Sequence, residues 1–230
     1  MKIAIISDIH GNLPALQGVL ADIDRAGVDH IINVGDTLGA PLESARTADL
    51  LTLRGIPMIA GNHERQLLTL PPERLNRSDA CTASEVSQAH RDWLASAPPT
   101  LWLADGVFVC HGTPHSDLHY WLETITDDFG RQGSPGVRAA TQAEVLERLG
   151  TGPHTAASII FCGHTHIPPW SVSPAQQAAI SSPSSTPAAS ACLRTTMCTL
   201  TNTTLKREAR TRGTPLPSKP LRAGRLICTA

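Results

Sequence analysis

Short runs of largely apolar residues alternate with longer amphipathic segments in the first part of the chain. Residues 3–6, 30–34 and 56–60 are typical of strands that are buried on both faces of a parallel sheet. Between them, residues 13–26 place leucine and isoleucine at helical spacing, and residues 42–54 also predict a helix. The alternation of strand and helix favours an α/β fold with parallel strands and right-handed crossovers.

The middle of the chain predicts a loop, a helix and a hairpin. Residues 71–81 are polar and rich in proline, which is typical of a loop. Residues 82–97 begin with a Thr-x-x-Glu capping box and predict a helix. Residues 101–103 and 107–110 flank an Asp-Gly pair, so we expect them to form two antiparallel strands.

An insertion separates this hairpin from the last predicted elements. It spans residues 113–136 and contains three clustered aromatic residues, Tyr120, Trp121 and Phe129. These rings either line a substrate pocket or pack a local core, and we favour the core. Residues 141–150 then start with a second capping box and predict a helix, and residues 158–162 predict a buried strand.

Polar side chains with metal-binding chemistry follow the predicted strands. They are Asp8, His10, Asp36, Asn62, His63, His111, His164 and His166. Singly, each is explained by a turn, a helix cap or a hydrogen-bonded loop. Together they indicate a metal site, because the carboxyl ends of parallel strands meet at one edge of a sheet.

The donor types limit the kind of metal. Imidazole suits Zn, Fe and similar ions, carboxylate suits Mn, and none of these positions offers a thiolate. This mixture favours a pair of borderline cations over calcium or a structural zinc. Two-metal sites hold their ions roughly 3.5–4 Å apart and act on phosphoryl groups by in-line displacement.

Five sequence blocks resemble the signature of a known family. They are Asp8-x-His10, Gly35-Asp36, Gly61-Asn62-His63-Glu64, His111-Gly112 and Gly163-His164-Thr165-His166. In this order they resemble the calcineurin-like metallophosphoesterases, most closely the small bacterial and archaeal phosphodiesterase branch. The resemblance covers residues 1 to about 168. It implies an α/β sandwich of two mixed β-sheets flanked by helices.

The resemblance also implies a role for each position. Asp8, His10 and His166 would bind the first metal, and Asn62, His111 and His164 would bind the second. Asp36 would bridge the two ions. We expect two divalent ions, Mn²⁺ ahead of Fe, Zn, Ni or Mg.

Two further residues of the third block have expected roles beside the metals. His63 would face the substrate and protonate the leaving oxygen, a role suited to imidazole. Arg65 is a weaker candidate for holding phosphate, because an exposed helix arginine explains it equally well.

We therefore expect a dinuclear metal-dependent phosphoesterase. It would hydrolyse phosphodiesters or small phosphorylated metabolites by attack of a metal-bridging hydroxide. The first alternative is a non-catalytic protein-interaction scaffold of the same fold, similar to the retromer-subunit branch. The presence of His63 favours the enzyme. A second alternative is an inactive product of a frameshifted gene.

Composition adds few constraints on partners. The formal net charge is −1, which indicates neither a nucleic acid nor a membrane surface as partner. The 6 cysteines are scattered, and Cys110 and Cys162 lie in apolar runs that predict buried thiols. With no signal segment recognised in the sequence, we expect a cytoplasmic protein. The oligomeric state is left open.

The final segment differs from the rest of the chain. Residues 169–230 are rich in Pro, Ser, Thr and Ala, and residues 170–230 hold eight basic residues and one acidic residue. Read from the third base of each codon, this tail permits VNPGSVGLPA and ETGSPHARYA, which resemble later segments of the family. We therefore expect a metallophosphoesterase domain in residues 1–168, followed by an out-of-frame, disordered tail in place of the C-terminal strands. The alternative is a genuine basic tail that binds an acidic partner.

Overall fold

The computed structural model describes residues 2–129, 131 and 136–167. Its helices are α1 Leu13–Ala26, α2 Ser44–Leu53, α3 Asn62–Thr69, α4 Arg77–Glu85, α5 Gln88–Ala95 and α6 Gln142–Leu149, with 3-10 turns at Pro72–Arg74 and Pro153–Ala156. Its strands are β1 Ile3–Ile6, β2 His30–Asn33, β3 Thr100–Ala104, β4 Val107–Cys110, β5 Glu123–Ile125, β6 Val137–Ala139 and β7 Ile159–Phe161. Among these residues, no helix is both long enough and apolar enough to span a bilayer.

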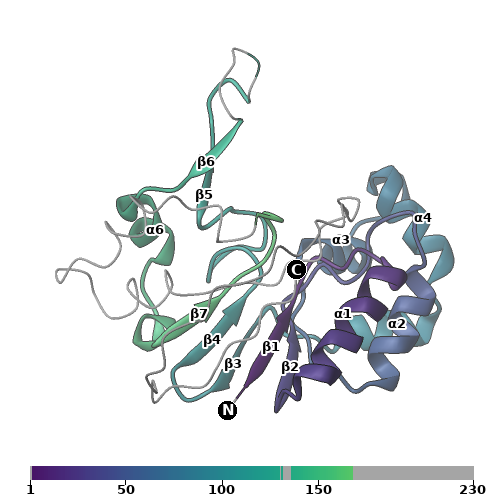
Figure 1. The fold of residues 1–230 in the computed structure, drawn as a ribbon. Helices are drawn as coiled ribbons and strands as arrows, with labels where there is room; N and C mark the ends of the chain where they lie inside the picture. Colours follow the sequence, from purple (N-terminus) through teal and green to yellow (C-terminus); the bar gives the residue numbers. More distant parts are fainter. Residues whose placement is uncertain (1, 130, 132–135, 168–230) are drawn as a thin grey trace, which may run out of the picture.

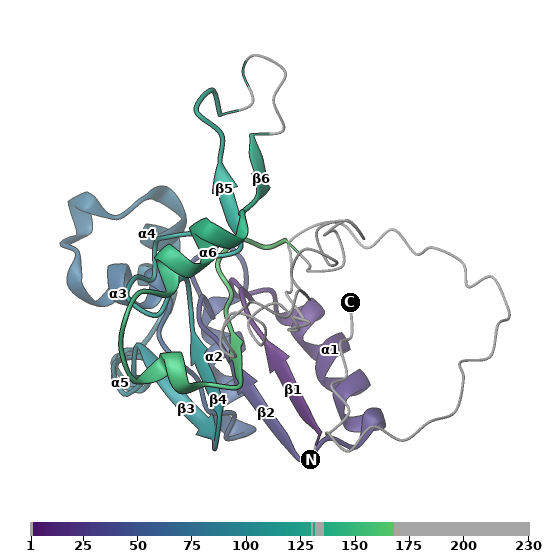
Figure 2. The same ribbon diagram turned by 90° about the vertical axis from the view of Figure 1, so that its left-hand side faces the viewer.

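Two sheets form the centre of the molecule, and a third pair of strands projects from it. Strands β1 and β2 are parallel, whereas β4 pairs antiparallel with β3 and parallel with β7. Helices α1 and α2 cover the outer side of the β1–β2 pair, and α6 lies beyond the second sheet (Figure 1). The β5–β6 hairpin extends away from this body as an arm (Figure 2). The expected α/β sandwich is confirmed.

Strand β1 is buried on both faces because each face meets a different layer. Ile3 and Ile5 belong to the core between the sheets, together with Val109 and Ile160. The alternate residues of the strand, including Ile6, pack with the apolar stripe of α1. An uninterrupted apolar run therefore predicts the correct position of this strand in the sandwich.

The third predicted strand, residues 56–60, is wrong as an extended element. Only Met58 pairs with β2, through a single parallel bridge to Asn33. Pro57 has no N–H to donate, and the N–H of Ala60 donates to the carbonyl of Pro98 at 2.8 Å. Residues 56–60 therefore pair with β2 at one residue only.

The loop predicted for residues 71–81 is wrong from Arg77 onward, and the helix start predicted at Thr82 is also wrong. Helix α4 begins at Arg77, where the side chain of Asn76 caps it by accepting from the N–H of Asp79 at 2.8 Å. Thr82 is buried inside this helix and does not cap it. The predicted single helix is interrupted before Ser87, which caps α5. Asparagine is as good a helix cap as threonine, and the earlier cap is the one the structure uses.

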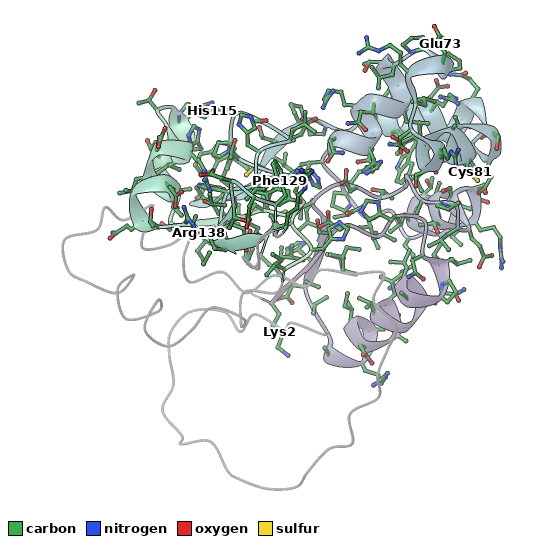
Figure 3. All side chains as sticks on the ribbon, turned by 90° about the horizontal axis from the view of Figure 1, so that it is seen from above. Lys2, Glu73, Cys81, His115, Phe129 and Arg138 are labelled. Atoms are coloured by element: carbon green, nitrogen blue, oxygen red, sulfur yellow. The ribbon has the colours of Figure 1, made fainter. Side chains whose placement is uncertain are left out.

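The aromatic insertion divides between core and surface. Trp121 is 1% exposed in the core between the sheets, and its indole N–H donates to the carbonyl of Val145 at 3.0 Å. Phe129, on the projecting arm, is 67% exposed (Figure 3). Tyr120 packs against His164 with ring centroids 5.0 Å apart. The core prediction is therefore correct for Trp121, whereas Tyr120 lies beside the predicted metal ligands.

Three further expectations for residues 101–162 are confirmed. The capping box at Thr141 starts α6, and the predicted hairpin is the β3–β4 pair. Cys110 and Cys162 are buried, as predicted. Viewed from above, the helical side with Glu73 and the side with Arg138 lie at opposite ends of the molecule (Figure 3).

Candidate metal centre

The loops that follow β1, β2, β4 and β7 converge at one end of the sandwich, where they meet the start of α3. Their backbone is unusual: only six non-glycine residues in the described ranges have positive φ. Five of the six are predicted ligands, Asp8, His10, Asp36, His164 and His166, with φ between 49° and 76°. Such conformations are costly for residues with a Cβ and are concentrated at functional sites. The local strain therefore coincides with the predicted metal site.

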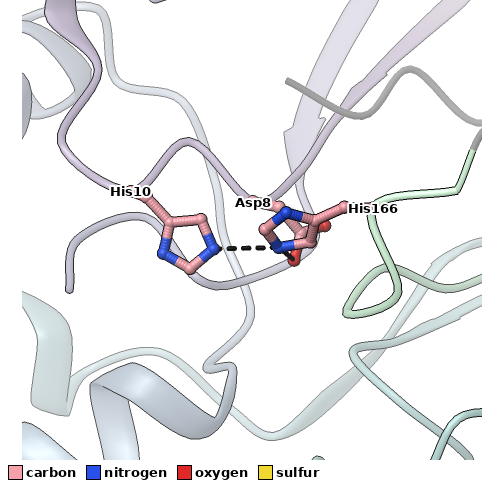
Figure 4. A group of neighbouring side chains, drawn as sticks. All are labelled: Asp8, His10 and His166. Carbon is pink, nitrogen blue, oxygen red and sulfur yellow. Dashed lines mark hydrogen bonds and ion pairs between the residues drawn. The ribbon is translucent and has the colours of Figure 1, made fainter. Parts of the chain in front are cut away.

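The first group of donors comprises Asp8, His10 and His166 (Figure 4). The Nε2 atoms of the two imidazoles are 3.0 Å apart, and Nε2 of His166 lies 3.2 Å from Oδ1 of Asp8. Burial lowers the pKa of His10, whereas the hydrogen bond to Asp8 raises the pKa of His166. Two ring nitrogens and a carboxylate that face one another in this way fit a cation, which would accept all three lone pairs.

The second group comprises Asp36, His111 and His164. Nε2 of His111 lies 3.1 Å from Oδ2 of Asp36, and its Nδ1–H donates to the carbonyl of Val34 at 2.9 Å. His164 is held through its other ring nitrogen, because its Nε2 contacts the carbonyl of Leu118 at 3.0 Å. These backbone contacts select the tautomers and leave one nitrogen of each ring for the site.

Asn62 supplies a further test of whether these residues fit a metal ion. The amide oxygen of Asn62 faces only acceptors. It lies 3.0 Å from Nδ1 of His164 and 3.2 Å from Oδ2 of Asp36. Exchanging the amide nitrogen and oxygen would convert these contacts into hydrogen bonds. A cation would satisfy the arrangement without any exchange, which is consistent with a metal-ligating amide.

Asp36 connects the two groups. Its carboxylate lies with His111 and His164 in one set of candidate donors, and with His10 and His63 in another. Burial alone would raise its pKa, but the charge of His111 and their hydrogen bond hold the pKa of Asp36 well below its usual range. Burial alone would lower the pKa of His111, but the charge of Asp36 and the same hydrogen bond raise it to about 10. Asp36 is thus an ionised, buried carboxylate at the centre of the site.

His63 lies at the edge of the donor cluster and has a partner that the sequence did not reveal. Its Nδ1 is 2.6 Å from Oδ1 of Asp79, a residue of α4 that is 1% exposed. Burial alone would lower the pKa of His63, but this hydrogen bond and the charge of Asp36 raise it. Asp79 was missed because it falls in the segment predicted to be a loop. The Asn-x-x-Asp capping pattern was the available signal.

Glu64 is a second residue whose role the sequence did not reveal. Its buried carboxylate accepts from the N–H groups of Asp36 and Gly61, both at 2.8 Å, and from those of Thr37 and Leu38 at 2.9 and 3.3 Å. Burial and the charge of Asp36 raise the pKa of Glu64 to about 7. Glu64 therefore fixes the loop that carries Asp36 against the start of α3.

Arg65 is paired with an acidic residue of the loop that follows β4. Its guanidinium donates to both carboxylate oxygens of Asp117, at 2.6 and 2.9 Å. The pair lines a cavity of about 540 Å³ that reaches His111 and is otherwise bordered by the loop around Ser116. Arg65 therefore lines the cavity beside His111 with its charge paired to Asp117, and its role in holding phosphate stays a prediction.

Two packed sheets with carboxylate, imidazole and amide groups gathered at one end define an α/β protein with a candidate metal centre. The family model for calcineurin-like phosphoesterases matches residues 1–168. The chain belongs to the calcineurin-like phosphoesterase family, and the family resemblance of the five sequence blocks is confirmed.

Individual relatives resemble parts of the chain. An uncharacterised protein of Methanocaldococcus jannaschii is 38% identical over 66 residues, which are 29% of this chain and 27% of that protein. A metallophosphoesterase structure from Sphaerobacter thermophilus is 26% identical with a TM-score of 0.48, and the match covers 72% of this chain and 61% of the other. A hypothetical protein of Pyrococcus horikoshii has a TM-score of 0.55 at 16% identity, with 73% and 71% covered, and shares the fold. The chain thus spans less than two thirds of the first two relatives.

Proposed function

We propose that this protein is a dinuclear metal-dependent phosphoesterase that hydrolyses phosphodiesters or small phosphorylated metabolites. The observation that carries the proposal is the pair of neighbouring donor groups, one of which contains the buried carboxylate of Asp36, while Asp36 also forms a candidate donor set with His10 of the other group. Asp8, His10 and His166 would hold one ion. Asn62, His111 and His164 would hold the other, with Asp36 between the two.

The metal pair, when bound, would supply Lewis-acid stabilisation of the phosphoryl oxygens and an activated water. The chain's own residues then orient the substrate and move its protons. His63 would donate a proton to the leaving oxygen, because it is the imidazole at the rim of the cluster whose pKa is raised. Its side chain is 20% exposed, so a substrate can reach it.

The cavity beside His111 is the proposed binding place for the organic part of the substrate. Its volume of about 540 Å³ falls within the range of small-molecule sites. Thr100, Thr113 and Ser116 are among its lining residues, together with His111 and His115, and the charges of Arg65 and Asp117 are paired with each other. This lining favours an uncharged, hydroxylated group over an additional phosphate.

Mn²⁺ is the proposed metal, with Fe, Zn, Ni and Mg as alternatives. The site mixes imidazole with two carboxylates and an amide oxygen, and in the described residues no cysteine belongs to the candidate donor groups. Such a mixture suits borderline cations and gives no preference for a structural zinc.

The test is hydrolysis of bis(p-nitrophenyl) phosphate by the full chain with Mn²⁺, with the bound metal quantified in the same sample. We expect metal-dependent turnover of this ester, and we expect hydrolysis of diphenyl phosphate, whose leaving group is more basic, to fall by about 10²-fold or more in His63→Ala. Asp49→Asn is the matched control, because Asp49 pairs with His90 on the surface at 2.9 Å, away from the candidate donors. Two bound metals without turnover would instead favour the protein-interaction scaffold.

A further inference from the structure

The carboxylate of Asp79 lies outside the donor groups but is directed at the site. In the described part of the chain, Asp79 belongs to none of the three sets of candidate metal ligands. Its Oδ1 contacts Nδ1 of His63 at 2.6 Å, and its Oδ2 accepts from the side-chain amide of Asn76 at 2.7 Å. Asp79 is 1% exposed, so its carboxylate is buried away from water and its one imidazole partner is His63.

A role limited to helix capping would not explain this placement. Asp79 lies in the first turn of α4, where a carboxylate stabilises the helix dipole even when it is exposed. The N–H of Asp79 is already satisfied by Asn76 at 2.8 Å. Burial of the side chain against His63 is therefore an additional feature that the helix itself does not require.

The His63 ring is also confined on its other sides. The backbone of Gly39, at φ +104°, lies so close that a Cβ built there would be 2.4 Å from Nδ1 of His63. The ring of His10 meets that of His63 edge to face, with centroids 5.0 Å apart. Together with Asp79, these contacts allow one ring orientation, with Nδ1 toward α4 and Nε2 left for the site.

We propose that Asp79 is a positioning residue that holds Nδ1–H of His63 toward α4, so that Nε2–H faces the leaving oxygen of the substrate. This inference rests on the proposed function. Water forms the new bond to phosphorus and releases one proton to solvent, while the bond to the leaving oxygen breaks and that oxygen keeps the electron pair. Nε2 of His63 then gives its proton to this oxygen, and Nδ1–H continues to donate to Asp79.

Leaving groups of different basicity give the activity test. Phenolate is more basic than p-nitrophenolate, so diphenyl phosphate depends more on a proton donor than bis(p-nitrophenyl) phosphate does. In the full chain with Mn²⁺, we expect Asp79→Ala to lower kcat about 30- to 100-fold for diphenyl phosphate and less than about threefold for bis(p-nitrophenyl) phosphate. Asp79→Asn keeps an acceptor oxygen and should lose less, and Asp49→Asn should match the wild type.

A second measurement needs neither metal nor activity. In ¹⁵N spectra of the histidine rings, we expect His63 in the wild type to show a protected, strongly deshielded Nδ1 proton that disappears in Asp79→Ala. The surface pair of His90 and Asp49 provides the reference, because Asp49→Asn should leave the His63 signal unchanged.

The outcomes separate this inference from the proposed function. Absence of hydrolysis by the wild type would contradict the proposed function, and the ring spectra alone would then decide whether Asp79 orients His63. An unchanged His63 signal in Asp79→Ala would overturn the inference. Equal losses of kcat for both esters, with the metal content unchanged, would also overturn it, because a purely structural role does not distinguish leaving groups.

Discussion

Asp36 is the residue on which the proposed two-metal site depends most. Both oxygens are engaged, Oδ2 with His111 at 3.1 Å and Oδ1 with the backbone N–H of His63 at 3.0 Å. The sequence predicted Asp36 as a ligand, since Gly-Asp follows a buried strand. It could not identify Glu64 as the group that fixes the Asp36 loop, because such a role depends on backbone N–H groups from two distant segments.

Removal of the Asp36 carboxylate should release both ions. Asp36→Ala deletes the ligand shared by the two groups, so metal content in the full chain should fall from two ions to fewer than one. Plasma mass spectrometry of the dialysed protein measures this, with Asp49→Asn as the control. Retention of two ions in Asp36→Ala would contradict the bridging role.

The buried pair of His111 and Asp36 predicts a pH dependence of stability in the metal-free protein. The folded pKa of His111 is raised to about 10, so its contribution is complete below the unfolded pKa near 6.5 and is lost as pH rises. The free energy of unfolding in urea should therefore decline between about pH 7 and pH 10. His111→Gln should flatten this decline, and an identical slope in that variant would exclude His111 as its origin.

Glu64→Gln should destabilise the fold through the Asp36 loop. One carboxylate oxygen becomes an amide donor that faces backbone N–H groups, so at least one buried N–H is left without an acceptor. We expect a loss of about 1–3 kcal/mol in the free energy of unfolding, measured by urea denaturation. A variant as stable as the wild type would show that the loop does not depend on this carboxylate.

At the level of elements, the sequence correctly predicted the helices and strands that depend on residues close together in the chain. The apolar stripe of α1, the Asp-Gly hairpin and the capping box of α6 all appear where the sequence places them. The failure at residues 56–60 has a tertiary cause, whereas the failure at α4 comes from the local cap at Asn76. Residues 56–60 pair with β2 only at Met58, and α4 starts five residues earlier than its predicted start at Thr82. The consequence for the site is concrete, because the missed turn of α4 carries Asp79.

The aromatic insertion is expected to be stabilised mainly by Trp121. Its ring is 1% exposed between the sheets and its N–H donates to a carbonyl of α6. Trp121→Ala should lower the free energy of unfolding by about 3–5 kcal/mol, measured in urea. Phe129→Ala is the matched control on the exposed arm, with an expected change within about 0.5 kcal/mol. Equal effects of the two substitutions would contradict the assignment of Trp121 to the core.

At the level of the whole molecule, the sandwich brings together predicted ligands that are distant in the chain. Asp8 and His166 are separated by almost the full length of the described region, yet Oδ1 and Nε2 are 3.2 Å apart. Because the structure describes the chain only to residue 167, the predictions for residues 169–230 lie outside it. The division into a metallophosphoesterase domain of residues 1–168 and an out-of-frame tail is therefore a proposal.

Resequencing the gene tests the origin of the tail. We expect a displaced reading frame between about residues 168 and 182, beyond which the corrected frame encodes the family-like segments VNPGSVGLPA and ETGSPHARYA. An unbroken frame that encodes the present tail, found also in close relatives, would contradict the frameshift and favour a genuine basic tail.

The central claim is that two metal ions share the carboxylate of Asp36. Electron paramagnetic resonance of the full chain loaded with two equivalents of Mn²⁺ tests it most directly, because two Mn²⁺ ions about 3.5–4 Å apart are magnetically coupled. We predict the multiline spectrum of a coupled pair, replaced by the six-line spectrum of isolated ions in Asp36→Ala. A six-line spectrum in the wild type at full loading would contradict the dinuclear site.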